Sequence, residues 1–491
     1  MTRSSELSFA SAGTLVSLLA ARKVSAIELC DLAIQRIESA DRAINAVVVR
    51  DFERAREAAR DADARRLRGE SGALLGLPVT VKEAYNVAGL PTTWGFTTAK
   101  DFRPPEDALA VTRLKAAGAI ILGKTNVPVF LSDWQSYNDL YGTTNNPWDL
   151  TRTPGGSSGG SAASLAAGYV ALELGSDIGG SLRTPAHYCG VFAHKPSLGL
   201  VPARGHTRPN VPALPMESDL AVIGPMARSA ADLSLGLDII AGPDAEATAI
   251  AYRLALPAAR HDDLKSYRVL VIDTHPLIPT ATAVSLALRG LMSRLEALGL
   301  KTARSSPLLP DLAQAGKIYS QLLSSIFGAF LPLETYASTA EAAKALPASD
   351  DSLAAWRRRG TVLSHRDWIL ADAARARLRQ QWRALFKEWD VVLCPPMPTP
   401  AFPHDHTPDQ KDRVIDIDGK TYPYLDQIVW PGVATLVGLP STAVPIGLSP
   451  GGLPIGVQII GPYLEDRTTL RFAELIEREF GGFVAPPALL A

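Results

Sequence analysis

Short runs of apolar residues alternate with helix-like stretches along most of the chain. The runs LLGLPVTV (74–81), AGAIILG (117–123), YRVLVID (267–273) and DVVLCP (390–395) have the length of buried β-strands. Between such runs the apolar residues recur at helical spacing, as in AVSLALRGLMSRLEALG (283–299). This alternation predicts an α/β fold around a largely parallel or mixed sheet.

The first 70 residues have a different pattern, in which helix-like stretches follow one another. Residues 8–65 are predicted to be helical. Ser25 and Glu28 fit a capping box at the start of one helix, because a serine and a glutamate at this spacing can satisfy each other's backbone N–H groups. We therefore expect a helical N-terminal arm over residues 1–70.

The chain has no evident linker between two independent parts, so we expect one large domain over residues 1–491. The stretch PPMPTPAFPHDHTPDQ (395–410) is rich in proline and is predicted to be a surface loop.

Composition and charge narrow the class of protein. Apolar residues make up 47% of the chain, charged residues 20%, and the formal net charge is -1, which gives no general attraction to nucleic acid or anionic membranes. No uncharged apolar run approaches the roughly 18 residues that a membrane helix needs. Glu6 and the basic pair Arg22 and Lys23 favour an amphipathic first helix over a signal peptide. Three scattered cysteines without a disulfide framework favour a reducing compartment, and we expect a cytoplasmic protein.

Two clusters of glycine and serine lie close together in GGSSGGSAASLAAGYVALELGSDIGGSLR (155–183). A flexible linker is disfavoured, because apolar segments enclose the second cluster. A phosphate-binding loop is disfavoured because the required lysine is missing. Ser158 satisfies the G-x-S-x-G nucleophile motif of α/β-hydrolases, although no strand precedes it. That alternative stays open, with a base from one of the later histidines His261, His275, His365, His404 and His406.

A serine hydrolase with a lysine base fits both clusters better. Ser181 follows a strand-like run and is the candidate nucleophile, with a second serine from the first cluster to move protons. Lys82 ends an apolar strand, where burial would lower the pKa of its amine and leave a neutral base. The backbone N–H groups of the turn can form an oxyanion hole, and the candidate donors are Ile178, Gly179, Gly180 and Ser181.

Several ordered motifs resemble the amidase signature family of serine hydrolases. They are VKEAYNVAGLPTT, GKTNVP, YGTTNNPWDLTRTPGGSSGGSAA, GSDIGGSLRTPA and HKPSLG, and they mark a signature core over residues 70–205. Weaker resemblance extends to GLPSTAVPIG and LPIGVQIIGP near the C terminus. The resemblance implies a large mixed, twisted central sheet flanked by helices on both faces. It also implies a catalytic triad of Lys82, Ser157 and Ser181, with a cis peptide bond at Ser157.

Supporting and substrate-binding residues are predicted around this core. Asp177 and Arg183 flank the nucleophile and are expected to hold its loop, while Ser158 and Thr153 are expected to hydrogen-bond the loop near the lysine. The resemblance places the acyl pocket after GKTNVP. The candidates for its lining are Leu131, Trp134, the polar residues Asp133 and Gln135, Trp430, and the helical stretch 317–331. Their apolar and aromatic character favours an aryl or alkyl acyl group.

The expected function is therefore hydrolysis of the C–N bond of a small carboxylic amide through an acyl-enzyme on Ser181. Two alternatives remain: a carbamate or ester hydrolase of the same family, and the glutaminase subunit of a tRNA-dependent amidotransferase, which would need a partner chain. The chemistry needs no cofactor, and no metal-binding motif such as H-E-x-x-H is present. We expect a monomer or homodimer that binds a small-molecule amide and neither nucleic acid nor membrane.

Overall fold

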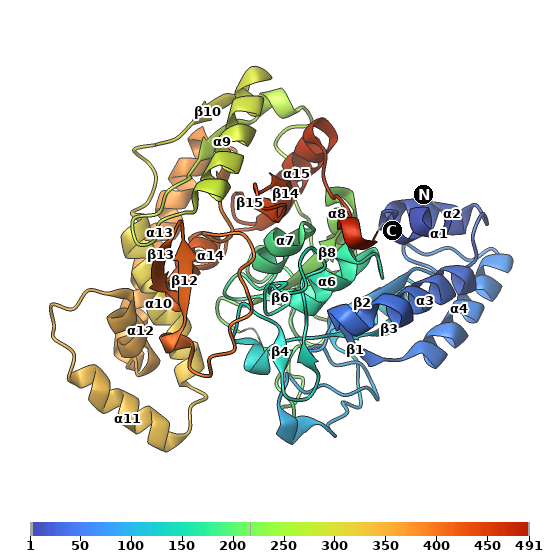
Figure 1. Ribbon diagram of the computed structural model, residues 1–491, viewed down its shortest axis with the longest axis horizontal. Helices are drawn as coiled ribbons and strands as arrows, with labels where there is room; N and C mark the ends of the chain where they lie inside the picture. Colours follow the sequence, from blue (N-terminus) through green and yellow to red (C-terminus); the bar gives the residue numbers. More distant parts are fainter. Residues whose placement is uncertain (1–2, 217, 490–491) are drawn as a thin grey trace.

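The structure is a computed structural model that describes residues 3–216 and 218–489. Within these residues, eleven strands form one sheet (Figure 1), in the spatial order β1 (Val47–Arg50), β3 (Ile120–Thr125), β2 (Pro78–Lys82), β6 (Leu172–Asp177), β8 (Val222–Ala227), β7 (Phe192–Lys195), β14 (Ser441–Leu448), β15 (Pro454–Ile460), β11 (Val391–Cys394), β9 (Arg268–Val271) and β10 (Lys301–Ala303). Two small hairpins pair β4 (Tyr137–Asn138) with β5 (Gly142–Thr143) and β12 (Val414–Ile417) with β13 (Lys420–Pro423).

The sheet is mixed, with parallel pairs toward both ends and antiparallel pairs between them. Strand β2 is parallel to β3 and β6, and strand β9 is parallel to β10 and β11. The strands from β6 through β8, β7, β14 and β15 to β11 pair antiparallel. The predicted α/β fold with a mixed sheet is therefore confirmed. The four runs that the sequence singled out contribute β2, β3, β9 and β11.

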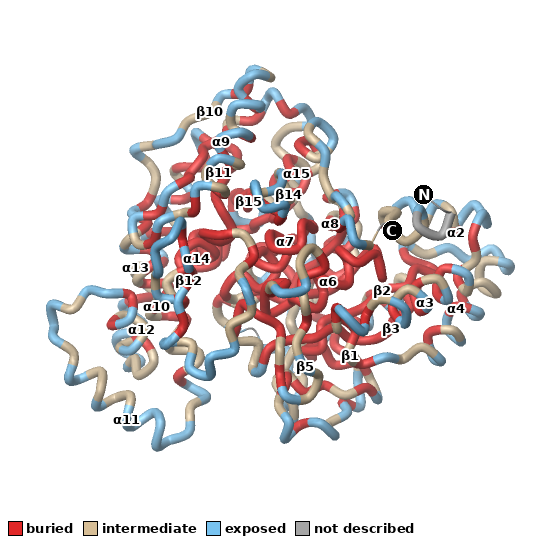
Figure 2. The backbone as a smooth tube through the Cα atoms, in the orientation of Figure 1, coloured by how far each residue is buried: buried red, intermediate tan, exposed pale blue. Residues whose placement is uncertain are grey.

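Helices flank the sheet on both faces (Figure 1). They are α1 (Arg3–Phe9), α2 (Ala12–Ala20), α3 (Ala26–Ile44), α4 (Phe52–Leu67), α5 (Leu109–Ala116), α6 (Gly159–Ala166), α7 (Arg183–Cys189), α8 (Ala230–Ile240), α9 (Thr282–Ala297), α10 (Leu312–Gly328), α11 (Leu333–Lys344), α12 (Leu353–Thr361), α13 (His365–Glu388), α14 (Val429–Thr435) and α15 (Asp466–Phe480). Figure 2 shows that burial concentrates along the sheet and the central helices, whereas α11 projects into solvent. No helix of the described residues is long and apolar enough to cross a membrane.

The N-terminal segment is largely helical, as predicted, but it also supplies an edge strand of the main sheet. The capping box is present, since Ser25 N donates to Glu28 Oε2 at 2.7 Å and Glu28 N donates to Ser25 Oγ at 3.2 Å. Strand β1 follows the left-handed residue Asn45, which ends helix α3, and pairs antiparallel with β3. The segment is thus joined to the sheet by backbone pairing as well as by helix packing.

The proline-rich stretch 395–410 differs from the surface loop predicted for it. Residues 395–399 are buried, and only the part beyond them comes to the surface. The carbonyl oxygens of Pro395 and Thr399 contact buried side chains. Gln458 Nε2 donates to Pro395 O at 2.9 Å, and the ring nitrogen His187 Nε2 lies 3.0 Å from Thr399 O. Proline lacks an N–H donor, so a Pro-rich segment can be buried with few backbone donors to satisfy.

Candidate active site

Lys82 is the last residue of β2, a strand whose five residues are all buried between β3 and β6. Its side chain is 0% exposed. The nitrogen Nζ lies 2.7 Å from Ser157 Oγ and 2.9 Å from the hydroxyl oxygens of both Ser158 and Ser176. Burial lowers the pKa of the amine to about 7, although the nearby carboxyl groups of Asp177 and Glu173 act in the opposite direction. The amine can therefore be neutral near pH 7 and accept a proton from a hydroxyl.

The two serines of the first cluster come from the loop that leads into α6. The peptide bond between Gly156 and Ser157 is cis. Gly156 is packed so closely that a Cβ atom there would lie 2.3 Å from the carbonyl oxygen of Asp133. Thr153 supports this loop, because its hydroxyl accepts from Gly155 N at 3.0 Å. A side chain at residue 156 would displace the loop that holds Ser157 against the lysine.

Ser181 lies in the turn between β6 and α7, next to the first serine cluster. Ser158 N donates to the Ser181 carbonyl oxygen at 3.3 Å, which ties the two clusters together. The Ser181 side chain lines a cavity, and within the described residues its hydroxyl makes no hydrogen bond. The structure thus brings Lys82, Ser157 and Ser181 into one site, and Ser181 is among the residues that line the cavity.

Two side chains hold the carbonyl groups of the turn before Ser181. The Tyr319 hydroxyl on α10 donates to Ile178 O at 2.5 Å, and Trp134 Nε1 donates to Gly179 O at 2.8 Å. Among the described residues, the N–H groups of Ile178, Gly179 and Ser181 have no hydrogen-bond acceptor. Gly180 corrects the sequence prediction, since its N–H already donates to Asp177 Oδ1 at 2.9 Å. Three of the four predicted donors therefore remain for an oxyanion.

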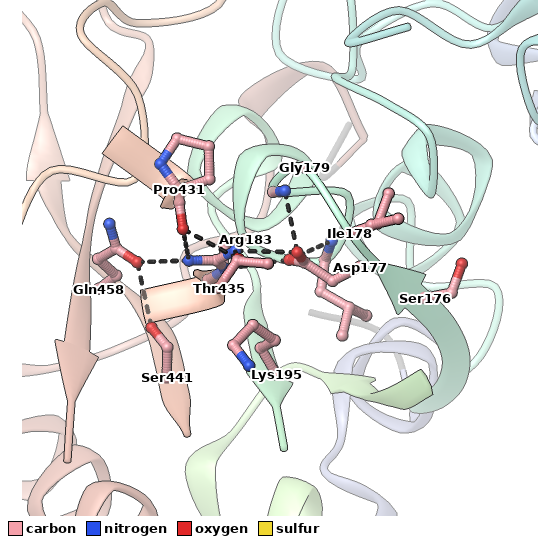
Figure 3. Close-up of polar contacts among 12 residues, drawn as sticks. Ser176, Asp177, Ile178, Gly179, Arg183, Lys195, Pro431, Thr435, Ser441 and Gln458 are labelled. Carbon is pink, nitrogen blue, oxygen red and sulfur yellow. Dashed lines mark hydrogen bonds and ion pairs between the residues drawn. The ribbon is translucent and has the colours of Figure 1, made fainter. Parts of the chain in front are cut away.

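Asp177 and Arg183 form a fully buried ion pair beneath this turn (Figure 3). Arg183 Nη2 and Nε donate to the two Asp177 oxygens at 2.9 and 3.0 Å. The other guanidinium bonds go to Pro431 O, Gln458 Oε1 and Thr435 Oγ1. Burial alone would raise the pKa of Asp177, but the charge and hydrogen bonds of Arg183, together with the charge of Lys195 and the N–H of Gly180, hold that pKa below its usual value. The pair fixes the turn from below, because Asp177 also accepts from the backbone of the turn.

The cavity beside Ser181 has a volume of about 840 Å³ and a largely apolar wall. Four phenylalanines contribute to that wall: Phe96, Phe130, Phe327 and Phe330. Leu131 and Trp134 line it as predicted, and helix α10 within the predicted stretch 317–331 adds Ser320, Leu323 and Ser324. Asp133 also lines the cavity, but Arg413 Nη1 and the Tyr424 hydroxyl both donate to its carboxylate at 2.6 Å.

Two residues that the sequence assigned to the pocket lie elsewhere. Gln135 is 0% exposed and holds the backbone of Asp405, donating to its carbonyl at 2.6 Å and accepting from its N–H at 2.9 Å. Trp430 is also 0% exposed and packs edge-on against His275 in the core, with ring centroids 5.3 Å apart. The correction is therefore that these two side chains support the site from inside the protein and do not line the cavity.

Sequence reasoning did not single out Ser176 and Tyr319. Ser176 contributes a third hydroxyl near the Lys82 amine. Its place directly before Asp177 in the GSDIGGS motif is the feature of the sequence that could have indicated this contact. Tyr319 lies in the stretch predicted to line the pocket, but its bond to the Ile178 carbonyl depends on how α10 packs, which the sequence does not display.

The arrangement around Ser158 differs from that of an α/β-hydrolase nucleophile. Its hydroxyl contacts Lys82 Nζ and Ser176, and among the described residues no histidine bonds to a serine of either cluster. His206 is the histidine whose ring packs on Tyr85 in this region, and burial lowers its pKa to about 3. The described residues contain no group of three or more His, Cys, Asp or Glu side chains arranged to hold a metal ion.

A model of the Amidase family matches residues 28–470. The chain belongs to the amidase family. It is 34% identical to a glutamyl-tRNA(Gln) amidotransferase subunit of Roseiflexus castenholzii, with 94% of each chain covered. It is 33% identical to the indoleacetamide hydrolase of Bradyrhizobium diazoefficiens, with 93% of this chain and 84% of that protein covered. The solved structure of the corresponding amidotransferase subunit of Thermotoga maritima superposes with a TM-score of 0.76 at 26% identity, covering 98% of both chains. The chain is thus about equally identical to this hydrolase and to this amidotransferase subunit.

Proposed function

We propose that this protein is an amidase that hydrolyses the C–N bond of a small carboxylic amide through an acyl-enzyme on Ser181. One observation carries the proposal: the buried Lys82 nitrogen lies 2.7 Å from the Ser157 hydroxyl, beside the turn that presents Ser181 to the cavity. A lysine that can be neutral near pH 7 supplies a base, and two serines supply a proton relay and a nucleophile.

In the acylation step, Ser181 Oγ attacks the carbonyl carbon of the amide. The Ser181 proton passes to Ser157 as the Ser157 proton passes to the neutral Lys82 amine. The carbonyl oxygen gains negative charge, which the free N–H groups of Ile178, Gly179 and Ser181 stabilise. No outside reactant takes part in this step.

Collapse of the tetrahedral intermediate then breaks the C–N bond. Ser157 donates a proton to the departing nitrogen and recovers one from Lys82, so the free amine leaves and an ester to Ser181 remains. Water attacks that ester with its proton taken by the same relay, which releases the carboxylic acid and restores the Ser181 hydroxyl. The products are one acid and one amine, and the reaction uses no cofactor.

The wall of the cavity supports an aryl or alkyl acyl group. Several phenylalanine and leucine side chains line the cavity that Ser181 also lines. Contact between these side chains and an apolar acyl group removes apolar surface from water, which favours binding. Carbamates and esters present the same carbonyl carbon to the nucleophile, so they are secondary substrates of the same proposal.

The similarity to the glutamyl-tRNA(Gln) amidotransferase chains favours a second candidate, hydrolysis of glutamine within a complex. Glutamine carries a positively charged α-ammonium group, and its binding needs a carboxylate that is free to accept hydrogen bonds from it. The acidic side chains that line the cavity already have partners, Asp133 with Arg413 and Asp409 with Lys411. This pairing supports the stand-alone amidase over the glutaminase. We propose that it works in the cytoplasm, as a single-domain monomer or homodimer.

The test is amine or ammonia release from a panel of primary amides, anilides, carbamates and glutamine, with Ser181→Ala as the matched control. Turnover of an apolar amide by the purified chain, lost in Ser181→Ala, supports the proposal. Hydrolysis of glutamine but of no other compound in the panel would favour the role of an amidotransferase component. Activity that appears only after a partner chain is added would favour the same role.

A further inference from the structure

One guanidinium in the cavity wall has no acidic partner among the residues that the structure describes. Arg208 lines the cavity, and none of the described Asp or Glu side chains forms an ion pair or hydrogen bond with it. Arg357, the other arginine of the lining, is paired with Asp426 at 2.8 Å. Since Asp133 and Asp409 are paired as well, Arg208 is the charged side chain of the largely apolar wall that lacks a partner of opposite charge among the described residues.

The Arg208 guanidinium is seated on an aromatic ring at the mouth of the cavity. Its central carbon lies 3.8 Å from the ring centroid of Phe330, a side chain that is 46% exposed. The Phe330 ring packs in turn against Phe130 at 5.9 Å between centroids. A cation held over a ring face keeps its charge and its N–H donors, so the guanidinium is fixed in place without being neutralised.

Helix α10 connects the reacting end of the cavity with this arginine. Tyr319 bonds the carbonyl of Ile178 beside Ser181, and Ser320, Ser324 and Phe327 of the same helix line the cavity. At roughly 1.5 Å of rise per residue, Phe327 lies about 12 Å along the helix from Tyr319. Phe330, which carries Arg208, follows just after the helix ends. The positive charge of Arg208 therefore lies next to Phe330, beyond the C-terminal end of the helix whose Tyr319 contacts the turn before Ser181.

A polar group in the cavity wall also lacks a partner. The Ser320 hydroxyl is buried, with the side chain 1% exposed, and makes no hydrogen bond among the described residues. A buried hydroxyl that loses its water without gaining a partner costs free energy, and Ser320 bears that cost in the wall beside the cavity. The wall is thus largely apolar, and Arg208 offers it a charged group with free N–H donors.

Building on the proposed amidase activity, we propose that Arg208 recognises a carboxylate at the end of the acyl group remote from the scissile amide. The substrate class is the monoamide of a dicarboxylic acid with a long alkyl or aryl-containing body. The apolar body lies along α10 and the phenylalanines, the amide carbonyl lies at Ser181, and the remote carboxylate accepts the paired N–H donors of Arg208. Arg208 is a specificity-determining residue in this arrangement and takes no part in bond breaking.

The experiment compares two chromogenic substrates of equal length, the mono-4-nitroanilide of sebacic acid and decanoyl-4-nitroanilide. The wild type is expected to show a kcat/KM at least about tenfold higher for the carboxylate-bearing compound, as a charged hydrogen bond implies. In Arg208→Gln the ratio of the two kcat/KM values is expected to fall to near one, whereas Arg208→Lys should retain part of the wild-type ratio. Rising salt concentration should reduce the ratio of the wild type. The control Arg478→Gln removes a surface arginine that pairs with Glu474 and leaves the ratio unchanged. A wild-type ratio near one, or a ratio that survives in Arg208→Gln, overturns the inference.

A binding arm separates this inference from the proposed activity. Calorimetry with Ser181→Ala protein measures the affinity for the same two compounds without chemistry. Tighter binding of the sebacic compound, lost in Ser181→Ala/Arg208→Gln, supports the recognition even where no hydrolysis is found. Equal binding of both compounds, or no binding of either, contradicts it.

Discussion

Lys82 Nζ and Ser157 Oγ lie 2.7 Å apart in a place that solvent does not reach, with the Lys82 side chain 0% and the Ser157 side chain 1% exposed. An ammonium group is costly to bury, and for this reason burial lowers the pKa of Lys82 to about 7. The contact therefore joins a base to a hydroxyl within hydrogen-bond reach, and the predictions below follow from it.

Replacing the base should abolish catalysis and leave the fold intact. Lys82→Met keeps a long apolar stem of similar volume but removes the amine. We expect kcat/KM to fall by about 10³-fold or more, by analogy with loss of a triad member in other serine hydrolases. Amide hydrolysis measures the loss, and circular dichroism checks that the variant has the wild-type spectrum. A Lys82→Met protein with wild-type activity is incompatible with a lysine base.

The pH dependence should follow the lysine. The protonated amine cannot accept a proton, so kcat/KM is expected to rise with pH up to about 7 and to level off above it. Lys195 is the control, because burial also lowers its pKa to about 7 while its Nζ donates to Pro196 O and makes no hydrogen bond to a serine among the described residues. Its charge acts on Asp177 beneath the turn, so the position of the rising limb is compared and not the absolute rate. The rising limb should persist in Lys195→Met. A profile that is flat between pH 5 and 9 contradicts a lysine base, and a limb that vanishes in Lys195→Met assigns the titration to the wrong residue.

The three hydroxyls around Lys82 should differ in importance. Ser157→Ala is expected to cost about 10³-fold in kcat, since it interrupts the relay. Ser158→Ala and Ser176→Ala each remove one bond that positions the amine, and such a bond corresponds to roughly ten- to a hundredfold. Steady-state kinetics of the three variants rank them directly. Equal losses in all three would show that Ser157 has no special role.

Breaking the buried ion pair should cost stability. Arg183→Met leaves the Asp177 carboxylate buried without its main partner, which is expected to lower the free energy of unfolding by about 3–5 kcal/mol. Urea unfolding measures this value. The control Arg478→Ala breaks an exposed pair with Glu474 and should change it by less than about 1 kcal/mol. If the two variants are equally stable, the buried pair does not support the turn.

The sequence predicted the type of fold because its signals are local. Apolar runs of strand length identified β2, β3, β9 and β11, and the capping pair Ser25 and Glu28 identified the start of α3. Strand β1 was missed because four residues between two long helices give too short a pattern, and its pairing with β3 is a long-range contact. The proline-rich stretch 395–399 was assigned to the surface because its composition resembles a loop, while its burial depends on side chains such as Gln458 from a distant strand.

The candidate site shows the same division. The candidate triad residues were predicted from motifs within the signature core, and the structure brings them close together. Gln135 and Trp430 were assigned to the pocket from neighbouring residues alone, but their side chains point into the protein, where Gln135 holds the Asp405 backbone. The use of the Gly180 N–H by Asp177 could not be foreseen either, because it depends on the conformation of the turn.

We propose above all that Ser181 is the nucleophile of an independent hydrolase. The most direct measurement is the intact mass of the protein after incubation with a fluorophosphonate, followed by peptide mapping of the adduct. We expect one adduct on Ser181 in the wild type and none in Ser181→Ala. A wild type that gains no mass, or an adduct on Ser158 or another serine that persists in Ser181→Ala, would contradict it.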